Sequence, residues 1–181
     1  MTFRKVGERE VFRGNARVAP ITAGVGTFES SDGHRFERDI VHHPGAVSIV
    51  PLMDDGRVVL VRQYRAPVDR EVLEIPAGKR DVDGEEPALT ARRELVEEVG
   101  LEAARIELLV EFFNSPGFCD EYSFTYLATG LTGVERAPVG HEEEAMQIEY
   151  VPLDDVPALI AAGELVDAKT IIGLLVARER L

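Results

Sequence analysis

Three glutamates within one short segment, Glu94, Glu97 and Glu98, have the types and spacing to hold a divalent cation together. On a helix, spacings of three and four residues place them within about 100° of one another. Like charges at these spacings cost roughly a few tenths of a kcal/mol per pair, and the helix dipole disfavours anions near the C-terminal end. A solvated face usually mixes both signs of charge, whereas here only Arg93 accompanies the glutamates. The cluster therefore favours a metal-binding face over a merely solvated one.

Every candidate ligand in this cluster is a carboxylate oxygen, which suits hard cations. We expect Mg²⁺ first and Mn²⁺ second. Zinc is not indicated, because the four histidines and one cysteine form no Cys/His ligand cluster in the sequence. The single cysteine, Cys119, also excludes an internal disulfide framework.

A helix over residues 87–99 must position these glutamates. Pro87 fits its first turn, and Gly100 fits the stop position just past its end. At about 100° per residue one side of this helix is apolar. That side consists of Ala88, Leu89, Leu95, Val96 and Val99. We expect the helix to bury this side and to carry the three carboxylates on the opposite one.

Short strands surround this helix in the sequence, and turn residues separate them. The expected strands are 11–18, 21–29, 35–42, 46–51, 58–65, 71–75, 106–113, 122–128 and 146–151, and further helices are expected at 154–162 and 168–178. The sequence Met53-Asp54-Asp55-Gly56 is typical of a hairpin.

Strands and helices are mixed without regular alternation. This pattern predicts an α+β fold or an α/β/α sandwich around a mixed sheet. Residues 1–45 are polar β material and are expected to form a small antiparallel sheet of their own, and residues 46–181 are expected to form the main domain.

Composition and charge restrict the possible partners. The chain has 181 residues, 45% of them hydrophobic, and a formal net charge of −13, which is the profile of a folded globular protein. Residues 1–80 have 13 basic and 11 acidic side chains, and residues 81–181 have 7 and 22, so the excess of negative charge follows residue 80. Such a balance disfavours nucleic acid. The first residues are charged and no apolar run is long enough for a membrane span, so we expect a cytoplasmic protein with no membrane partner.

The segment from Gly78 through Glu85 to Leu101 resembles the signature of the Nudix hydrolases, G-x5-E-x7-R-E-U-x-E-E-x-G-U, where U is aliphatic. The second half matches at every specified position, with seven residues between Glu85 and Arg93. The first half departs from the pattern, because six residues rather than five separate Gly78 from Glu85. We interpret this as a one-residue insertion in the loop.

The resemblance implies an α/β/α Nudix sandwich with a mixed sheet, dependence on Mg²⁺, and hydrolysis of a nucleoside diphosphate linked to another group. It implies that Glu94 and Glu98 are metal ligands and that Glu97 is a ligand or holds the metal-bound water. Arg93 would orient Glu97 by an ion pair, and the backbone carbonyl of Ala77 would complete the shell of one metal ion.

The region after the signature is similar to the ADP-ribose pyrophosphatase subfamily, in which a proline follows the signature at about this distance. Pro116 lies sixteen residues after Gly100, between Ser115 and Gly117. The likeness implies a substrate of the nucleoside diphosphate sugar class, and ADP-ribose would yield AMP and ribose 5-phosphate. Arg65 is the candidate phosphate contact, because a guanidinium matches phosphate oxygens, and Glu121 is the candidate for a ribose hydroxyl.

A second acidic cluster, at residues 140–144, is expected to be a loop before the strand 146–151. The resemblance implies that this loop supplies the general base and one more metal ligand. Alignment on the following strand places the base at Glu142 and the ligand at Glu144. A shift of one residue leaves Glu143 open as the base, with His141 as a minor alternative.

In this subfamily the N-terminal sheet pairs two subunits and contributes to the partner's adenine pocket, which implies a homodimer through residues 1–45. Phe12, Phe28 and Phe36 are the aromatic residues available for stacking on the base. Two alternatives stay open, a hydrolase of GDP-mannose or another nucleoside diphosphate sugar, and a non-catalytic regulator that binds ADP-ribose. The intact second half of the signature and the lack of a basic segment disfavour the regulator.

Overall fold

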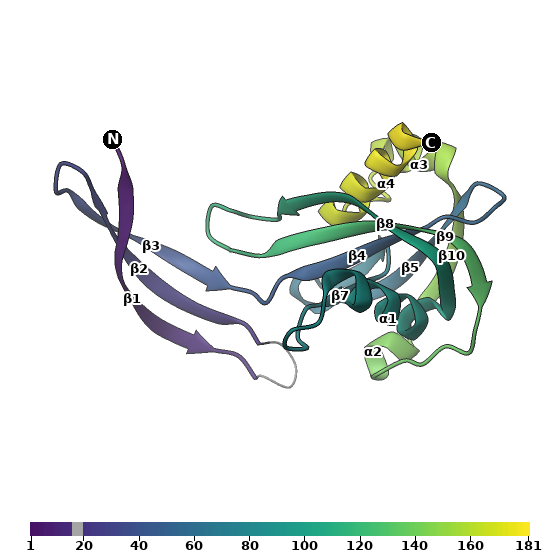
Figure 1. Ribbon diagram of the computed structural model, residues 1–181, viewed down its shortest axis with the longest axis horizontal. Coiled ribbons are helices and arrows are strands. Elements are labelled where there is room, and N and C mark those ends of the chain that lie inside the picture. The colour runs from purple at the N-terminus through teal and green to yellow at the C-terminus, as the bar shows by residue number, and fades with distance from the viewer. Residues whose placement is uncertain (16–19) are drawn as a thin grey trace. The chain divides into compact units, whose positions relative to one another are not determined.

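The computed structural model describes residues 1–15 and 20–181. The chain forms two compact units (Figure 1). The first unit comprises Met1–Gly45 and Phe113–Tyr122, and the second comprises Ala46–Phe112 and Ser123–Leu181. The segment Phe113–Tyr122, which contains the predicted substrate residues Pro116 and Glu121, therefore belongs to the same unit as the N-terminal strands.

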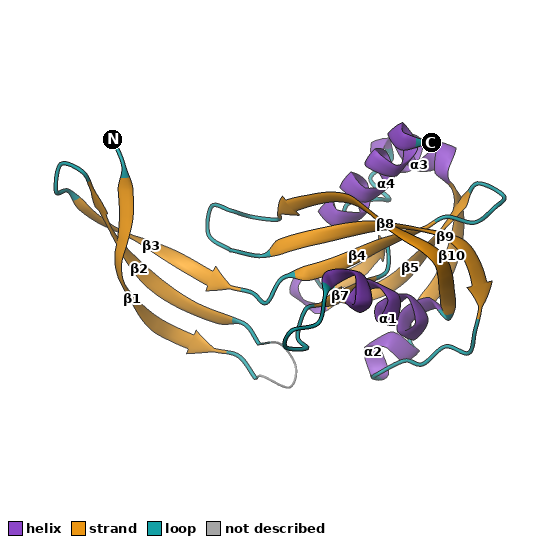
Figure 2. Cartoon of the chain, viewed as in Figure 1, coloured by secondary structure: helices purple, strands orange, loops and turns teal. Residues whose placement is uncertain are grey.

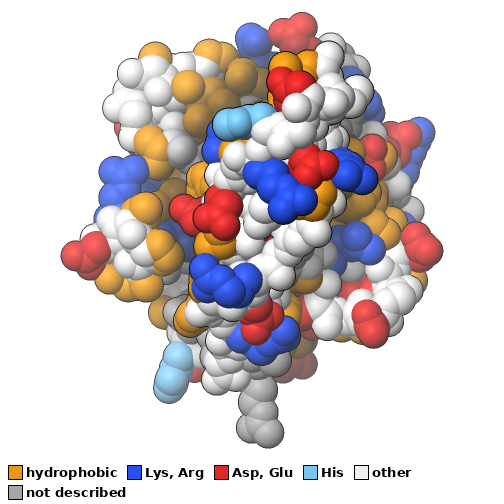
Figure 3. Space-filling model, turned by 90° about the vertical axis from the view of Figure 1, so that its left-hand side faces the viewer, with side chains coloured by type: hydrophobic (Ala, Val, Ile, Leu, Met, Phe, Trp, Pro, Cys, Tyr) orange, Lys and Arg blue, Asp and Glu red, His pale blue; other side chains and the backbone are white. Residues whose placement is uncertain are grey.

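The first unit contains a three-stranded sheet in the order β1-β2-β3. Its strands are β1 (Phe3–Arg13), β2 (Thr22–Ser30) and β3 (Arg35–His42), and both pairings are antiparallel. The predicted small antiparallel sheet is thus confirmed. Strand β1 starts well before the predicted residue 11, and residues 16–18 of that predicted strand lie outside the described residues. Basic and acidic side chains lie next to one another over the face shown in Figure 3.

The second unit is built on two sheets, in the orders β7-β4-β9-β8 and β10-β5-β6. The strands are β4 (Ala46–Pro51), β5 (Arg57–Arg65), β6 (Arg70–Glu74), β7 (Ala77–Lys79), β8 (Leu101–Phe113), β9 (Tyr122–Gly133) and β10 (Gln147–Pro152). Strand β4 runs parallel to β9 and antiparallel to β7, so the first of these sheets is mixed, as predicted.

Helices cover both sides of these sheets (Figure 2). They are α1 (Pro87–Val99), α2 (His141–Glu144), α3 (Val156–Ala161) and α4 (Ala168–Arg180), with 3-10 turns at Ala66–Val68 and Leu153–Asp155. One apolar core joins α1 to β4 and β5, and a second joins α3 and α4 to the same strands. This is the expected α/β/α sandwich. In the part of the chain that the structure describes, none of the helices is both long enough and apolar enough to cross a membrane.

The predicted hairpin at residues 53–56 is wrong in one respect. The turn forms, because the N–H of Met53 donates to the carbonyl of Arg57 at 2.8 Å and Leu52 bridges Val58. The two strands then diverge, because β4 pairs with β7 and β9 while β5 pairs with β6 and β10. Tertiary pairing therefore overrides the local hairpin pattern.

The face that α1 buries also differs from the prediction. Leu89, which the periodicity places on the apolar side, is 56% exposed. Glu94 and Glu98 are buried beside Leu95 instead. Strand β7 covers these two carboxylates, because Ala77 bonds to Glu98 and Gly78 lies against Glu94, and the periodicity of the helix sequence does not indicate such a covering segment.

The backbone that precedes β7 is held by helix α4. Asp167 caps α4 by accepting hydrogen bonds from the N–H and the hydroxyl of Thr170, at 2.9 and 2.8 Å. The hydroxyl of Thr170 in turn accepts the backbone N–H of Ile75 at 3.0 Å. Both Thr170 and Ile75 are fully buried, so this bond fixes the chain just before Ala77.

We expect Thr170→Val to destabilise the protein by about 1–3 kcal/mol, because it leaves the buried N–H of Ile75 without an acceptor. Denaturant unfolding measures the loss. Thr170→Ser keeps the hydroxyl and serves as the matched control, which should retain most of the stability. A valine variant as stable as the serine variant would contradict this role.

Candidate active site

Glu98 lies at the centre of the site. Its side chain accepts the backbone N–H of Ala77 at 3.0 Å, and the residue is only 4% exposed. Burial raises the pKa of Glu98 to about 8, because the hydrogen bond from Ala77 compensates only part of the lost hydration. Positive charge placed beside this carboxylate would therefore favour its ionised form.

Glu94 lies one helical turn earlier and is 7% exposed. Its carboxylate covers Gly78, where an added Cβ would lie 2.0 Å from the Cδ of Glu94. Any side chain at position 78 would displace this carboxylate, which explains the glycine. Burial is the largest cause that raises the pKa of Glu94 to about 7.

Arg93 connects three carboxylates. It contacts Glu94 at 2.8 Å, Glu97 at 2.9 Å and Glu85 at 3.4 Å. The ion pair with Glu97 is the contact that the resemblance implies for this arginine. Glu85 also accepts the hydroxyl of Thr90 at 2.8 Å, so the extra residue before Glu85 does not separate it from the signature helix.

The donor set fits a hard divalent cation. The side chains of Glu94, Glu97 and Glu98 offer only oxygen; Arg93 pairs with Glu94 and Glu97, and the charge of Arg65 acts on Glu98. Two of these carboxylates are buried, and burial is the largest cause of their raised pKa values, so a cation bound beside them would favour their ionised forms. Within the described residues no three acidic, histidine or cysteine side chains are grouped as a metal site, so the assignment of ligands stays a prediction.

The second acidic cluster is a short helix, α2, rather than the predicted loop. The side chain of Glu142, the predicted base, lies outside what the structure describes. Glu144, the predicted ligand, is exposed and pairs with His141 at 3.0 Å. Among the described side chains of α2, Glu143 contributes to the raised pKa values of Glu94 and Glu98 through its charge.

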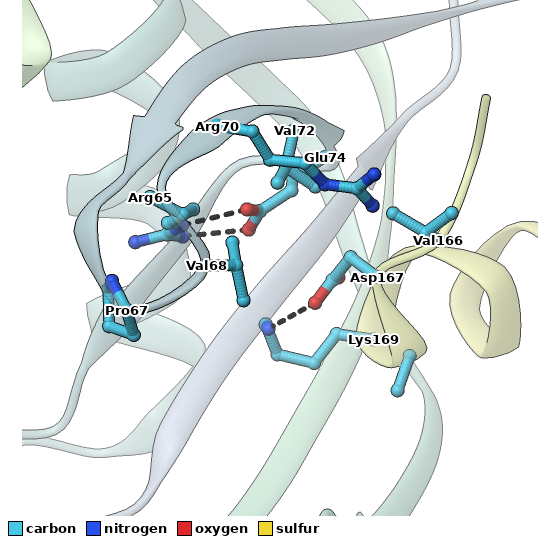
Figure 4. A pocket seen from close by; sticks show the side chains of 10 residues that line it. Arg65, Pro67, Val68, Arg70, Val72, Glu74, Val166, Asp167 and Lys169 are labelled. Carbon is cyan, nitrogen blue, oxygen red and sulfur yellow. Dashed lines mark hydrogen bonds and ion pairs between the residues drawn. The ribbon is translucent and has the colours of Figure 1, made fainter. Parts of the chain in front are cut away.

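Arg65 lines a pocket of about 360 Å³ beside β6 and the start of α4 (Figure 4). Its Nε and Nη2 atoms each donate to the carboxylate of Glu74 at 2.7 Å. Glu74 is buried, so Arg65 is held as half of a two-bond ion pair. A second ion pair, Lys169 with Asp167 at 2.7 Å, lies across the same pocket.

The predicted substrate residues Pro116 and Glu121 lie in the first unit, while Arg65 and the carboxylates of α1 lie in the second. Pro116 helps to line a pocket of about 360 Å³ within the first unit. The carbonyl of Glu121 accepts the N–H of Asn114 at 3.2 Å, which closes the loop.

The three candidate aromatics of the first unit differ in their surroundings. The rings of Phe28 and Phe36 stack on each other with centroids 5.6 Å apart. The guanidinium of Arg38 lies over Phe36 at 4.8 Å. Phe12 is 58% exposed, so it is the most accessible of the three in this chain.

Several structural partners are absent from the sequence prediction. Glu74, which holds Arg65, belongs to the short strand β6 (REVLE), where alternation alone does not identify its partner. His42 lies between Asp120 and Glu8, at 2.5 and 2.7 Å, and these two carboxylates raise its pKa. These contacts join distant parts of the chain, so spacing alone could not reveal them.

Comparisons with known proteins agree with the geometry. A model of the NUDIX domain matches residues 42–172. An ADP-ribose pyrophosphatase of Bacillus subtilis (strain 168) is 37% identical over 92% of this chain and 88% of its own length. An ADP-ribose pyrophosphatase of Mycobacterium tuberculosis is 45% identical over 76% of this chain and 67% of its own length.

A solved structure titled as an ADP compounds hydrolase has the same fold, with a TM-score of 0.85. It covers 100% of this chain and 95% of its own chain at 24% identity, so it supports the fold alone. The domain match, the two relatives and the signature helix with its buried carboxylates lead to one conclusion. This chain belongs to the Nudix family.

Proposed function

We propose that this protein hydrolyses the pyrophosphate bond of ADP-ribose, or of a closely related nucleoside diphosphate sugar, to release AMP and a sugar phosphate. The observation that carries the proposal is the pair of buried carboxylates, Glu94 and Glu98, packed against the backbone at Ala77 and Gly78. Two neighbouring buried carboxylates suit a site that binds cations together with a polyanionic substrate. The pyrophosphatase relatives favour ADP-ribose among the possible substrates.

Mg²⁺, or Mn²⁺ in its place, is the proposed cofactor. Glu94, Glu97, Glu98 and Glu144, with the carbonyl of Ala77, would hold it. When bound, the ion would neutralise the diphosphate and lower the pKa of a water molecule. Arg93 would keep Glu97 oriented through the ion pair at 2.9 Å.

The remaining steps fall to side chains that contact the substrate or its attacking water. Glu142 is the proposed general base, with Glu143 and Glu144 as the alternatives on α2. Arg65 would contact a phosphate, and Glu74 holds its guanidinium so that less freedom is lost on binding. Pro116 and Glu121 would contact the nucleoside or sugar portion.

A homodimer through residues 1–45 is part of the proposal. All eleven residues of β1 are exposed, and they include Phe3 and Phe12. An edge strand with exposed aromatic side chains is a surface that a second copy could cover. Nucleic acid is not a proposed partner, because the net charge is −13. The cytoplasmic location stays a prediction.

Incubation of the protein with Mg²⁺ and a panel of ADP-ribose, GDP-mannose, other nucleotide sugars and dinucleotides tests the activity. We expect AMP from ADP-ribose, and Glu98→Gln should lower kcat by about 10²–10³-fold or more, because it removes a charge on which the site depends. Glu102→Gln, an exposed carboxylate just after α1, is the matched control and should keep normal turnover. Preferred cleavage of GDP-mannose would contradict the ADP-ribose assignment and support the GDP-mannose alternative. Binding of ADP-ribose without cleavage would support the non-catalytic regulator instead.

Stability should depend on pH through the buried carboxylates. In EDTA, the folded state holds a proton on Glu98 up to about pH 8, whereas the unfolded chain releases it near its ordinary value of 4.5. This contribution to stability is fully present below the unfolded-state pKa of 4.5, and it is lost as the pH rises through the folded-state pKa of about 8. The thermal midpoint should therefore fall over this range, and Mg²⁺ should restore it at the alkaline end.

Glu98→Gln is the comparison for this measurement, because an amide does not titrate. Its midpoint should fall less with pH than that of the wild type, and at pH above 8 it should equal or exceed the wild-type value. An identical pH dependence in the two proteins would contradict the assignment.

Sedimentation equilibrium tests the dimer. We expect twice the monomer mass of 19.9 kDa at micromolar concentration. Phe12→Asp, which places a charge on exposed β1, should shift the equilibrium toward monomer without unfolding the chain. A wild-type monomer at this concentration would count against the dimer.

A further inference from the structure

Arg136 contacts α2 from the chain segment between β9 and α2. Its Nη2 donates a hydrogen bond to the backbone carbonyl of Glu143. The same carbonyl accepts the N–H of Met146 at 3.1 Å. The guanidinium is partly buried, and its Nε atom has no hydrogen-bond partner within the part of the chain that the structure describes.

The backbone around Arg136 also packs against the C-terminal end of α1. The N–H of Val134 donates to the carbonyl of Gly100 at 2.9 Å. A Cβ added at Gly100 would lie 2.9 Å from the carbonyl oxygen of Val134 and 3.3 Å from the Cβ of Arg136. Gly100 has a φ of 64°, so the close approach and the backbone conformation both favour glycine here. One short segment therefore touches the end of α1 and holds α2.

We propose that Arg136 is a positioning residue, which sets the distance between the carboxylates of α1 and the acidic residues of α2. This inference rests on the proposed function, because it gives α2 a part in the reaction. Helix α2 has only four residues and no side-chain cap, so its own hydrogen bonds cannot fix its place. Buried Met146 anchors the chain just after α2, and Arg136 supplies a second anchor on the carbonyl of Glu143.

Electrostatics explain why an anchor is needed. Glu143 is close enough for its negative charge to act on Glu94 and Glu98, and like charges repel one another. Without a fixed attachment, this repulsion would favour positions of α2 farther from the site. Arginine suits the task, because its long side chain carries several N–H donors and one of them reaches the carbonyl of Glu143.

The test compares Arg136→Ala and Arg136→Lys with the wild type on ADP-ribose and Mg²⁺. We expect kcat to fall by about 10- to 100-fold in the alanine variant while KM changes by less than about threefold, because a misplaced catalytic group slows the reaction more than it weakens binding. The kcat of Arg136→Lys, which keeps the positive charge, should lie between those of the wild type and Arg136→Ala. Added guanidinium ion, at concentrations that do not unfold the protein, should restore part of the lost kcat.

Arg180 provides the matched control. It lies at the end of α4, and it also donates to backbone carbonyls, those of Leu108 and Leu109 at 3.0 and 2.8 Å. Arg180→Ala removes a similar arginine–carbonyl contact that does not involve α2. Its kcat should therefore equal that of the wild type, and added guanidinium ion should have no effect on it.

Hydrogen exchange in EDTA gives a readout that does not depend on turnover. Amides of residues 144–146 should exchange faster in Arg136→Ala than in the wild type or in Arg180→Ala. A kcat within about twofold of the wild type would overturn the proposal, as would unchanged exchange at these amides. If the wild type cleaves nothing in the panel, the proposed function fails, and the exchange comparison still decides whether Arg136 anchors α2.

Discussion

The burial of two carboxylates of α1 is the constraint on which this structure depends. Glu94 and Glu98 retain few contacts with water, and the burial raises their pKa values to about 7 and 8. A fold selected for stability alone would not keep this arrangement, because uncompensated buried charge is costly. Strand β7 makes room for these carboxylates: Gly78 has no side chain where Glu94 lies, and the backbone N–H of Ala77 donates to Glu98.

The rest of the second unit holds α1 and the backbone at Ala77 in place relative to each other. Leu95 fixes the buried side of α1 in the core between that helix and the strands. On the far side of the sheet, Thr170 holds the N–H of Ile75 and so fixes the backbone that leads to Ala77. The packing on both faces of the sheet therefore fixes β7 and α1, which is where pre-organisation matters for a charged site.

Local signals predict much of this architecture. Pro87 and Gly100 define the ends of α1 because capping and φ preferences act within a few residues. The ion pair of Arg65 with Glu74 could not be predicted, because it depends on strand register. The same holds for the burial of Glu94, which a covering segment causes, and for the exposure of Leu89. The early start of β1 is equally non-local, since its polar residues become a strand by pairing with β2.

The grouping of Phe113–Tyr122 with the N-terminal strands has a consequence for how the gene could be divided. The backbone of Cys119 forms an isolated β-bridge with Val41 at the end of β3, and the carboxylate of Asp120 forms a hydrogen bond with the ring of His42. A fragment that begins at residue 46 would keep this loop but lose the strand on which it lies. A cut before residue 46 would thus leave the loop Phe113–Tyr122 in the hydrolase domain without the strand with which it pairs. Replacement of the N-terminal sheet during evolution would require replacement of this loop as well.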